Sequence, residues 1–452
     1  MDSKLLRQHV DVSTLSSLTS KEVMRLHLKH MNAVAARVIN FTGMDRQFTK
    51  ASGIHLTDSK GRNYLDFISG YGACNLGHEP PEVLVALRAV EGKANILQAS
   101  LNPYAAKLAE LLAELSPGKL NRAFFCNSGT EAVEAALKLA RIVTGRKILL
   151  STNGAYHGKT FGALSVSGKK KYRTPFEPLL PDTKLIDYDD LGALEEALRK
   201  KDIAGFIVEP IQGESGIIVP NEGYLKQAEL LCKQSDTPFI VDEVQTGMGR
   251  TGRFFCSEDE GVHPDILVMS KSLGGGVMPI GAMLTSDRLW KKAYGSRETC
   301  LLHTSTFGGN SRACACAIAA INTLLEKDLI TNACEQGLYL LEKLEQLKNK
   351  SSVLKDVRGK GLMIGLHFER LKGKQTLMEG ALSLWVVRQL FHKHRIATAF
   401  TLNNYDVLRI YPPLCVTREQ ILFFLESLET TLMSMDKLAK WGLVSSTRED
   451  MD

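Results

Sequence analysis

The sequence has no long apolar run. None of its 452 residues lies in a stretch that approaches the roughly 20 apolar residues needed for a membrane-spanning helix. Its first residues, MDSKLLRQHVDVSTLSS, lack an apolar signal core, which argues against secretion. The nine cysteines form no Cys-x-x-Cys pair, so we predict neither a metal site nor a disulfide framework. A reducing, cytoplasmic location fits this cysteine usage best.

The sequence also has little excess charge of either sign. Its 56 lysines and arginines against 50 aspartates and glutamates give a formal net charge of +6. One basic run, Lys169-Lys170-Lys171, is followed by Tyr172 and Arg173, and we interpret it as a solvated loop. We therefore expect no nucleic-acid partner and no membrane partner. The hydrophobic content of 44% is typical of a globular protein.

Strand-like and helix-like segments alternate from about residue 80 to residue 325. Such alternation predicts an α/β fold, with a mostly parallel sheet that carries helices on both faces. The chain ends carry hairpin-like pieces instead, among them alternating segments at 47–57 and 63–67, which predict a smaller α+β domain. The predicted division is 1–75 for the N-terminal part of the small domain, 76–326 for the large domain and 327–452 for the C-terminal part of the small domain.

Two apolar runs, at residues 238–241 and 265–269, lead directly to Asp242 and to Ser270-Lys271. Both runs predict buried strands of a parallel sheet, and ligands of such sheets bind beyond the carboxyl ends of the strands. We therefore expect Asp242 and Lys271 at one rim of one sheet. This pair suits pyridoxal 5′-phosphate, because a lysine forms a Schiff base with its aldehyde and a carboxylate keeps its pyridine nitrogen protonated. Taken singly, Asp242 could cap a helix and Lys271 could lie on the surface.

The stretch Ser128-Gly129-Thr130-Glu131 has the form of a capping box before an apolar-periodic helix. A helix N-terminus with glycine exposes free N–H groups to an anion, so Gly129 and Thr130 are candidate phosphate contacts. An ordinary capped helix explains the stretch equally well. Tyr156 follows a strand-like run and could cover the face of a planar cofactor, or simply pack on its neighbours. We interpret the adjacent His157 as a structural histidine.

Taken together, these stretches resemble class III (ω-) aminotransferases, which are fold type I pyridoxal-phosphate enzymes. The matching stretches are NSGTEAVEAALKLAR (127–141), AYHGKTFGALSVSG (155–168), VEPIQGESGIIVP (208–220), VDEVQTGMGRTG (241–252), SKSLGGGVMPIGAM (270–283), HTSTFGGNSRACACA (303–317) and VRGKGLMIGL (357–366). Within the class, PFEPLLP (175–181) and TLNNYDVLRIYPPL (401–414) are most similar to bacterial putrescine (diamine) aminotransferases. The resemblance implies the fold type I architecture, with 76–326 as the cofactor-binding domain.

The resemblance also implies a role for individual residues. Lys271 would be the Schiff-base lysine and Asp242 the partner of the pyridine nitrogen. Cofactor contacts would come from Ser128, Gly129 and Thr130 at the phosphate, Tyr156 on the ring face and Gln245 at the phenolic oxygen. Thr306 would reach the phosphate of a neighbouring subunit, which implies a homodimer. Arg409 would bind the carboxylate of a 2-oxo acid or of glutamate, and Glu214 would pair with Arg409 when an amine without that carboxylate is bound.

The implied reaction moves an amino group from an ω-amine or a putrescine-like diamine to 2-oxoglutarate, giving an aldehyde and glutamate. The alternatives are a 4-aminobutyrate, ornithine or acetylornithine enzyme, an aminomutase, or a cofactor-binding regulatory protein. A nucleotide site is excluded because no GxxxxGK[ST] motif follows a strand. Glu214 and Arg409 could also form an ordinary structural ion pair. Ser215 stands where the family usually has glycine and could narrow the pocket wall beside Glu214, an effect that the sequence does not decide.

Overall fold

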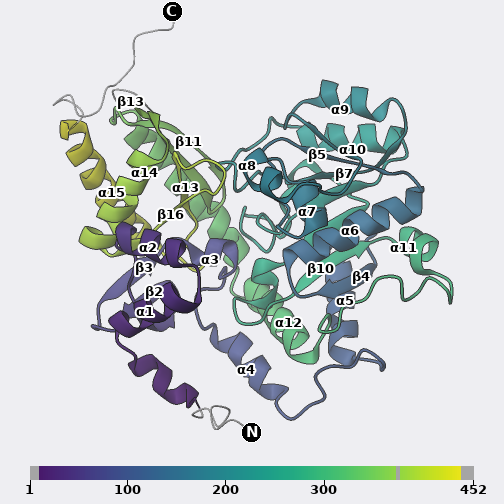
Figure 1. Ribbon diagram of the computed structural model, residues 1–452, viewed down its shortest axis with the longest axis horizontal. Helices are drawn as coiled ribbons and strands as arrows, with labels where there is room; N and C mark the ends of the chain where they lie inside the picture. Colours follow the sequence, from purple (N-terminus) through teal and green to yellow (C-terminus); the bar gives the residue numbers. More distant parts are fainter. Residues whose placement is uncertain (1–9, 373–376, 439–452) are drawn as a thin grey trace, which may run out of the picture.

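The computed structural model describes residues 10–372 and 377–438. These residues form two lobes that lie side by side (Figure 1). The larger lobe is built on a seven-stranded sheet and the smaller lobe on two four-stranded sheets. A two-stranded ribbon of β13 (Leu371–Lys372) and β14 (Leu377–Met378) completes the strand inventory of the described residues.

The seven-stranded sheet is mostly parallel, as the alternating pattern predicts. Its strands, in spatial order, are β4 (Arg122–Cys126), β10 (Gly281–Thr285), β9 (Ile266–Met269), β8 (Phe239–Asp242), β7 (Ile203–Val208), β5 (Ile148–Thr152) and β6 (Thr183–Ile186). Only β10 runs antiparallel to its neighbours in this sheet. Strands β7, β8 and β9 are buried along their whole length, because helices cover both faces. The α/β fold class is confirmed.

Helices pack on both faces of this sheet. One face carries α6 (Gly129–Thr144), with α7 (Phe161–Ser165) and α11 (Asp287–Tyr294) beside it. The other face carries α5 (Pro103–Leu115), α9 (Leu191–Leu198), α10 (Tyr224–Gln234) and α12 (Ser311–Glu326), and α4 (Pro81–Ala89) packs on α12. Helix α6 lies close to the sheet because its buried face is rich in alanine. Its Ala140 meets Gly205 of β7, where a Cβ atom would lie 2.9 Å from the Ala140 Cβ. Small residues on both elements therefore bring the α6 N-terminus close to the strand ends.

The smaller lobe combines both ends of the chain. One sheet joins β1 (Phe48–Ser52), β2 (His55–Asp58) and β3 (Asn63–Asp66) to β15 (Ile396–Ala397), which runs parallel to β3. The second sheet has the order β11 (Leu354–Lys360), β12 (Met363–Phe368), β17 (Val407–Ile410) and β16 (Ala399–Phe400). Helices α13 (Leu329–Lys348), α14 (Ala381–Gln389) and α15 (Arg418–Leu438) accompany these sheets. The domain boundaries at residues 75 and 326 stay a prediction, and part of the C-terminal segment lies outside the described residues.

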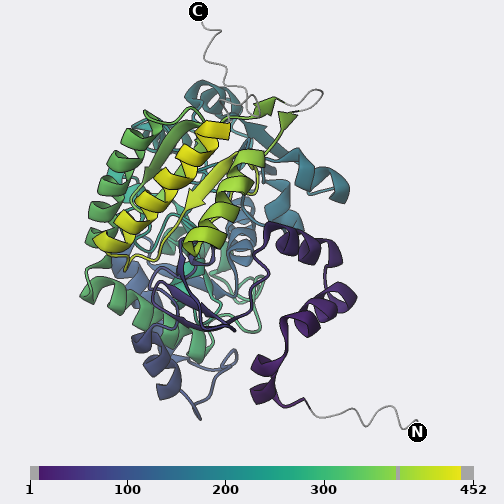
Figure 2. The same ribbon diagram turned by 90° about the vertical axis from the view of Figure 1, so that its left-hand side faces the viewer.

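Two local features differ from the sequence prediction or add to it. The single strand predicted over 47–57 is divided into β1 and β2, because Gly53 turns the chain with a φ of +55° and pairs with His78 instead. The N-terminal helices α1 (Ser20–His30) and α2 (Ala33–Thr42) stand out from the body of the molecule (Figure 2).

Among the described residues, we find no helix with the length and apolar character to cross a membrane.

A fully buried arginine, Arg250, joins the two lobes. Its guanidinium donates to the backbone carbonyls of Leu362 and Pro412 and to Oδ1 of Asn75, at 3.0, 2.6 and 2.7 Å. The Tyr411 ring lies 5.4 Å from the guanidinium carbon. Burial lowers the pKa of Arg250 to about 10, since its acceptors are neutral. This contact ties the loop after β8 to segments from both ends of the chain.

Candidate active site

Asp242 and Lys271 lie at the same rim of the central sheet. Asp242 is the last residue of β8, and Lys271 is the first residue of the 3₁₀ turn η5 (Lys271–Gly274) that follows β9. Strands β8 and β9 are parallel neighbours in which Asp242 lies opposite Val268. Both side chains line one cavity of about 320 Å³. The strand-end argument therefore places an acid and a lysine in a common site.

Six of the residues singled out in the sequence line this cavity: Gly129, Thr130, Tyr156, Asp242, Gln245 and Lys271. The remaining lining residues are His157, Gly158, Lys159, Glu209, Val244 and Ser270. The first group comes from the N-terminus of α6, the loop after β5, and the ends of β8 and β9. These elements are brought together because the carboxyl ends of parallel strands meet at one edge of the sheet.

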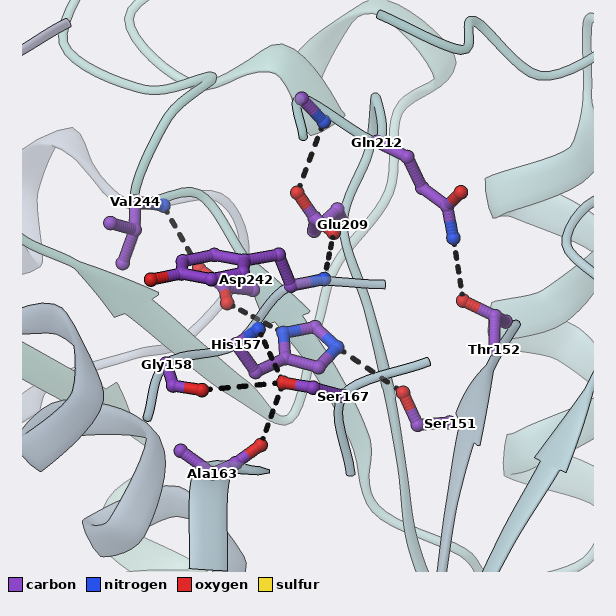
Figure 3. A network of polar contacts seen from close by, with 12 residues as sticks. Ser151, Thr152, His157, Gly158, Ala163, Ser167, Glu209, Gln212, Asp242 and Val244 are labelled. Carbon is purple, nitrogen blue, oxygen red and sulfur yellow. Dashed lines mark hydrogen bonds and ion pairs between the residues drawn. The ribbon is translucent and has the colours of Figure 1, made fainter. Parts of the chain in front are cut away.

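The Asp242 carboxylate is held in a fixed orientation inside the protein (Figure 3). Its Oδ2 lies 2.7 Å from Nδ1 of the buried His157, and its Oδ1 accepts a hydrogen bond from the Val244 N–H at 3.1 Å. The other ring nitrogen of His157 lies 3.2 Å from Oγ of Ser151. His157 is thus a hydrogen-bonded histidine, as interpreted from the sequence, but the group it positions is Asp242. No sequence pattern pointed to that partner.

Glu209 is a site residue that the sequence analysis did not single out. It is buried, and its two carboxylate oxygens accept hydrogen bonds from the backbone N–H groups of Tyr156 and Gly213, at 2.8 and 3.2 Å (Figure 3). Burial raises the pKa of Glu209 to about 7. Glu209 directly follows the buried strand β7, so the strand-end rule that points to Asp242 points to Glu209 as well.

The N-terminus of α6 forms the phosphate-like end of the cavity. Ser128 caps the helix, and its Oγ accepts from the Glu131 N–H at 3.4 Å. The predicted reciprocal bond differs, because the Glu131 carboxylate accepts from the Asn127 N–H at 2.9 Å rather than from that of Ser128. The N–H groups of Gly129 and Thr130 have no acceptor among the described residues. They face an anion site of the kind that helix N-termini provide.

The loop after β5 packs tightly on this helix end. Oγ1 of Thr130 lies 2.8 Å from Oγ1 of Thr160. Gly158 has a φ of +127°, and a Cβ there would lie 2.2 Å from Thr130 Oγ1. The glycine of the Tyr156-His157-Gly158 turn is therefore required for the loop to approach the helix.

Glu214 and Arg409 form an ion pair next to the cavity. Arg409, on β17, is fully buried and donates through Nη2 to Oε2 of Glu214 at 2.5 Å. Its guanidinium carbon lies 5.0 Å from the Tyr71 ring centre and 5.2 Å from that of Tyr411. Two other guanidinium nitrogens, Nε and Nη1, have no hydrogen-bond partner among the described residues. The pair therefore leaves part of a buried cation available to an anion.

Two further contacts and the burial of the site define the electrostatics of this pair. The Glu214 carboxylate also accepts from Nε2 of Gln245 at 3.1 Å and from the Leu402 N–H at 2.9 Å. Burial favours the protonated acid, but Arg409, the Leu402 N–H and Lys271 together outweigh burial and lower the pKa of Glu214. Burial also lowers the pKa of Lys271, although the carboxylates of Glu214 and Asp242 oppose that shift. A larger fraction of Lys271 is consequently the neutral, nucleophilic amine.

Two expectations from the sequence fall outside the cavity. Thr306 lines a separate hollow of about 430 Å³ with Asn127, Glu131 and His303. Ser215 does not line the cavity, and its Oγ donates to the Gly154 carbonyl at 2.6 Å.

The residue set fits pyridoxal 5′-phosphate. Unpaired N–H groups at a helix N-terminus suit its phosphate, the fixed Asp242 carboxylate suits its pyridine nitrogen, and Lys271 suits its aldehyde. Within the described part of the chain there is no group of three or more His, Cys, Asp or Glu side chains that could hold a metal ion.

Comparisons with known proteins agree with this site. The family model "Aminotransferase class-III" matches residues 39–432. The chain is 36% identical over 463 residues to aminotransferase PigE of Serratia sp. (strain ATCC 39006). The matched region covers 93% of this chain and 54% of that protein. The chain therefore spans about half the length of this curated relative.

Solved structures extend the likeness over the whole length of their chains. An ornithine aminotransferase from Toxoplasma gondii, with partial occupancy of PLP at its active site, has a TM-score of 0.85 and 30% identity over 96% of this chain and 100% of that one. An acetylornithine aminotransferase from Elizabethkingia anophelis has a TM-score of 0.76 and 31% identity over 92% of this chain and 100% of that one. Family match, fold and cavity agree, and the chain belongs to the class-III aminotransferases, a family that depends on pyridoxal 5′-phosphate.

Proposed function

We propose that the protein transfers an amino group from an ω-amine or a putrescine-like diamine to 2-oxoglutarate, releasing an aldehyde and glutamate. The observation that carries this proposal is the buried Glu214–Arg409 pair beside the cavity. A transaminase of this kind must accept a substrate with no carboxylate near its amine and then a dicarboxylate. The Arg409 guanidinium can accept the amine while it is paired with Glu214, and the dicarboxylate once it is released from Glu214.

The geometry of the pair supports this alternation. With Glu214 in place, Arg409 is neutralised, and an uncharged alkyl chain can lie beside it. When Glu214 turns away it releases Nη2, and Nη2 together with Nε or Nη1, which have no partner among the described residues, can then bind a carboxylate through two parallel hydrogen bonds. A fixed structural ion pair gives no reason to leave these nitrogens unpaired in a fully buried side chain.

Each cofactor-binding residue predicted from the sequence has a proposed task. Bound pyridoxal phosphate supplies an aldehyde that carries the amino group and a ring that withdraws electrons from the substrate carbon. Lys271 would bind the cofactor's aldehyde and, as a free amine, would move the proton between the donor's amine-bearing carbon and the cofactor's C4′ atom. Asp242, which His157 orients, would keep a proton on the pyridine nitrogen. Ser128, Gly129 and Thr130 would bind the phosphate, Tyr156 would cover the ring and Gln245 would bind its phenolic oxygen.

The proposal includes a homodimer. Thr306 lies in a hollow that is separate from its own chain's cavity, which supports a contact with the phosphate of a neighbouring subunit. The domain division at residues 75 and 326 is part of the same proposal, with the large domain binding the cofactor. The paired β3 and β15 support placing both chain ends in the small domain.

A second candidate is an enzyme of the ornithine, acetylornithine or 4-aminobutyrate type. The likeness to ornithine and acetylornithine aminotransferase structures favours this candidate. It has the same fold and the same proposed site residues, so the two candidates differ only in the donor. An aminomutase needs no separate acceptor and would form no glutamate.

The visible spectrum of the holoenzyme separates these candidates. We expect putrescine to bleach the cofactor's visible band and 2-oxoglutarate to restore it with one glutamate formed per site. Ornithine, acetylornithine and 4-aminobutyrate are tested in parallel. Bleaching by one of these alone would identify that amine, rather than putrescine, as the donor. The Lys271→Ala variant serves as the control, because it should perform neither half of the reaction. Bleaching by no amine, or restoration without glutamate, would overturn the proposal.

A further inference from the structure

The short helix α8 (Lys170–Arg173) of the larger lobe is bound to the loop 401–405 of the smaller lobe. Helix α8 lies where the two lobes meet (Figure 1). Three hydrogen bonds make this contact: Lys169 Nζ to the Asn403 carbonyl at 2.8 Å, Lys171 Nζ to the Tyr405 hydroxyl at 2.8 Å, and the Tyr172 hydroxyl to the Leu402 carbonyl at 2.9 Å. We call Lys169, Lys171 and Tyr172 the α8 clasp. Lys169 and Lys171 of the basic run thus contact the other lobe, although Lys170 and Lys171 are exposed as predicted for a solvated segment.

The opposite side of the same loop holds Glu214. The Leu402 N–H donates to Oε2 of Glu214 at 2.9 Å, and the Asn403 N–H donates to the Glu214 backbone carbonyl at 2.9 Å. Leu402 and Asn403 therefore face the clasp with their carbonyl groups and Glu214 with their N–H groups. The segment Leu402–Asn403 therefore connects the clasp residues to the Glu214 carboxylate.

A third contact fixes the backbone of Glu214. The Gly154 carbonyl accepts from Ser215 Oγ at 2.6 Å and from Asn403 Nδ2 at 2.9 Å. Ser215 is the residue that replaces the family's usual glycine. Its hydroxyl joins the Glu214 loop to the same carbonyl that anchors Asn403. The backbone at 214–215 is consequently fixed on both sides, and the carboxylate is the part left to move.

We propose that the α8 clasp positions Leu402 so that it favours the Glu214–Arg409 pair and thereby sets the balance between amine and dicarboxylate substrates. This inference rests on the function proposed above. In leaving Arg409, the Glu214 carboxylate also gives up the Leu402 N–H. A loop held by the clasp keeps that donor in place, so it stabilises the paired state. A loosened loop stabilises this state less.

The consequence for substrate binding has opposite signs for the two substrates. A dicarboxylate binds the unpaired state, and its apparent affinity is reduced by the fraction of protein in that state. Loosening the clasp enlarges that fraction, so the KM for 2-oxoglutarate falls. An amine without a carboxylate binds the paired state, so its KM rises. General damage to the site raises both KM values.

The test uses holoenzyme variants that remove single clasp bonds. Tyr172→Phe deletes one hydroxyl and keeps the ring, and Lys169→Met deletes one ammonium group. The matched control is Lys170→Met, which changes an exposed side chain on the same helix. For the double variant we expect a fall of roughly three- to tenfold in acceptor KM and a rise of similar size in donor KM, the scale of one or two hydrogen bonds. Lys170→Met should change neither.

A Glu214→Gln variant separates failure of the clasp from failure of the proposed function. If Glu214→Gln moves the two KM values in opposite directions and the clasp variants match Lys170→Met, the clasp proposal is overturned alone. If Glu214→Gln also leaves both KM values unchanged, the alternation of Glu214 fails and the clasp proposal fails with it. Equal rises of both KM values in the clasp variants overturn the proposal too. Should the double variant not fold, Tyr172→Phe alone decides, since it removes one oxygen atom.

Discussion

Replacement of Glu209 by glutamine should remove a pH-dependent part of the protein's stability. The wild-type carboxylate is buried and accepts the N–H groups of Tyr156 and Gly213. Glutamine has a similar shape but only one accepting oxygen, so its amide nitrogen would face one of these donors. The loss of one buried hydrogen bond should lower the free energy of unfolding by about 1–3 kcal/mol. This part of the difference does not vary with pH, because glutamine does not titrate.

The pH-dependent contribution follows from the pKa of Glu209, which burial raises from 4.5 to about 7. Such a rise corresponds to about 3 kcal/mol of difference between folded and unfolded protein. Because the folded state binds this proton more tightly, the stabilisation is complete below about pH 4.5 and is lost as the pH rises through 7. Wild-type stability should therefore fall with rising pH relative to that of Glu209→Gln.

Urea unfolding of the cofactor-free protein between pH 5 and pH 8.5 measures this difference. Near pH 5 the wild type should be more stable than Glu209→Gln, and most of that advantage should disappear by pH 8. Glu222→Gln, which changes an exposed glutamate in the segment after the same strand, is the control and should follow the wild-type curve. Parallel curves for wild type and Glu209→Gln would refute the reasoning, because they would mean that Glu209 carries no extra proton in the folded protein.

Three further predictions follow from the described contacts. Gly158→Ala should lower stability by more than about 1 kcal/mol and weaken cofactor retention, since φ is +127° and the new Cβ would press on Thr130; an unchanged melting temperature and cofactor content would contradict this. Arg250→Met should destabilise the fold by about 3 kcal/mol or more, because it leaves several buried acceptors unpaired; a urea midpoint equal to that of the wild type would count against it. Inactive Lys271→Ala and Thr306→Arg subunits, mixed and reassociated in equal amounts, should regain about a quarter of wild-type activity if Thr306 serves its neighbour, and no activity if it serves its own chain.

The sequence predicted the central sheet and its functional rim for a physical reason. Buried parallel strands are continuous apolar runs, and the polar residues that follow them meet at one edge, which placed Asp242 and Lys271 together. The same rule extends to Glu209, which directly follows the buried strand β7. The antiparallel β10 was not foreseen, because its short apolar run follows three glycines and carries no signal of direction.

Contacts between distant segments could not be predicted from pattern. Glu214 and Leu402 are 188 residues apart, and nothing local to either residue indicates the other. The Glu214–Arg409 pair was expected only from the family resemblance, because periodicity and composition do not encode contacts across 195 residues. The direction of the Ser215 side chain likewise depends on a contact with Gly154, 61 residues away in the sequence, that no local pattern indicates.

The parallel pairing of β3 with β15 has a consequence for biosynthesis. Leu65 pairs with Ile396, so the N-terminal strands leave the ribosome 331 residues before their partner does. At translation rates of roughly 5–20 residues per second, β3 would wait roughly 17–66 seconds with one edge open. The seven-stranded sheet lies entirely within that interval of the chain. The central sheet can therefore form before β15 pairs with β3, and the open edge of β3 is a surface that a chaperone could cover in the meantime.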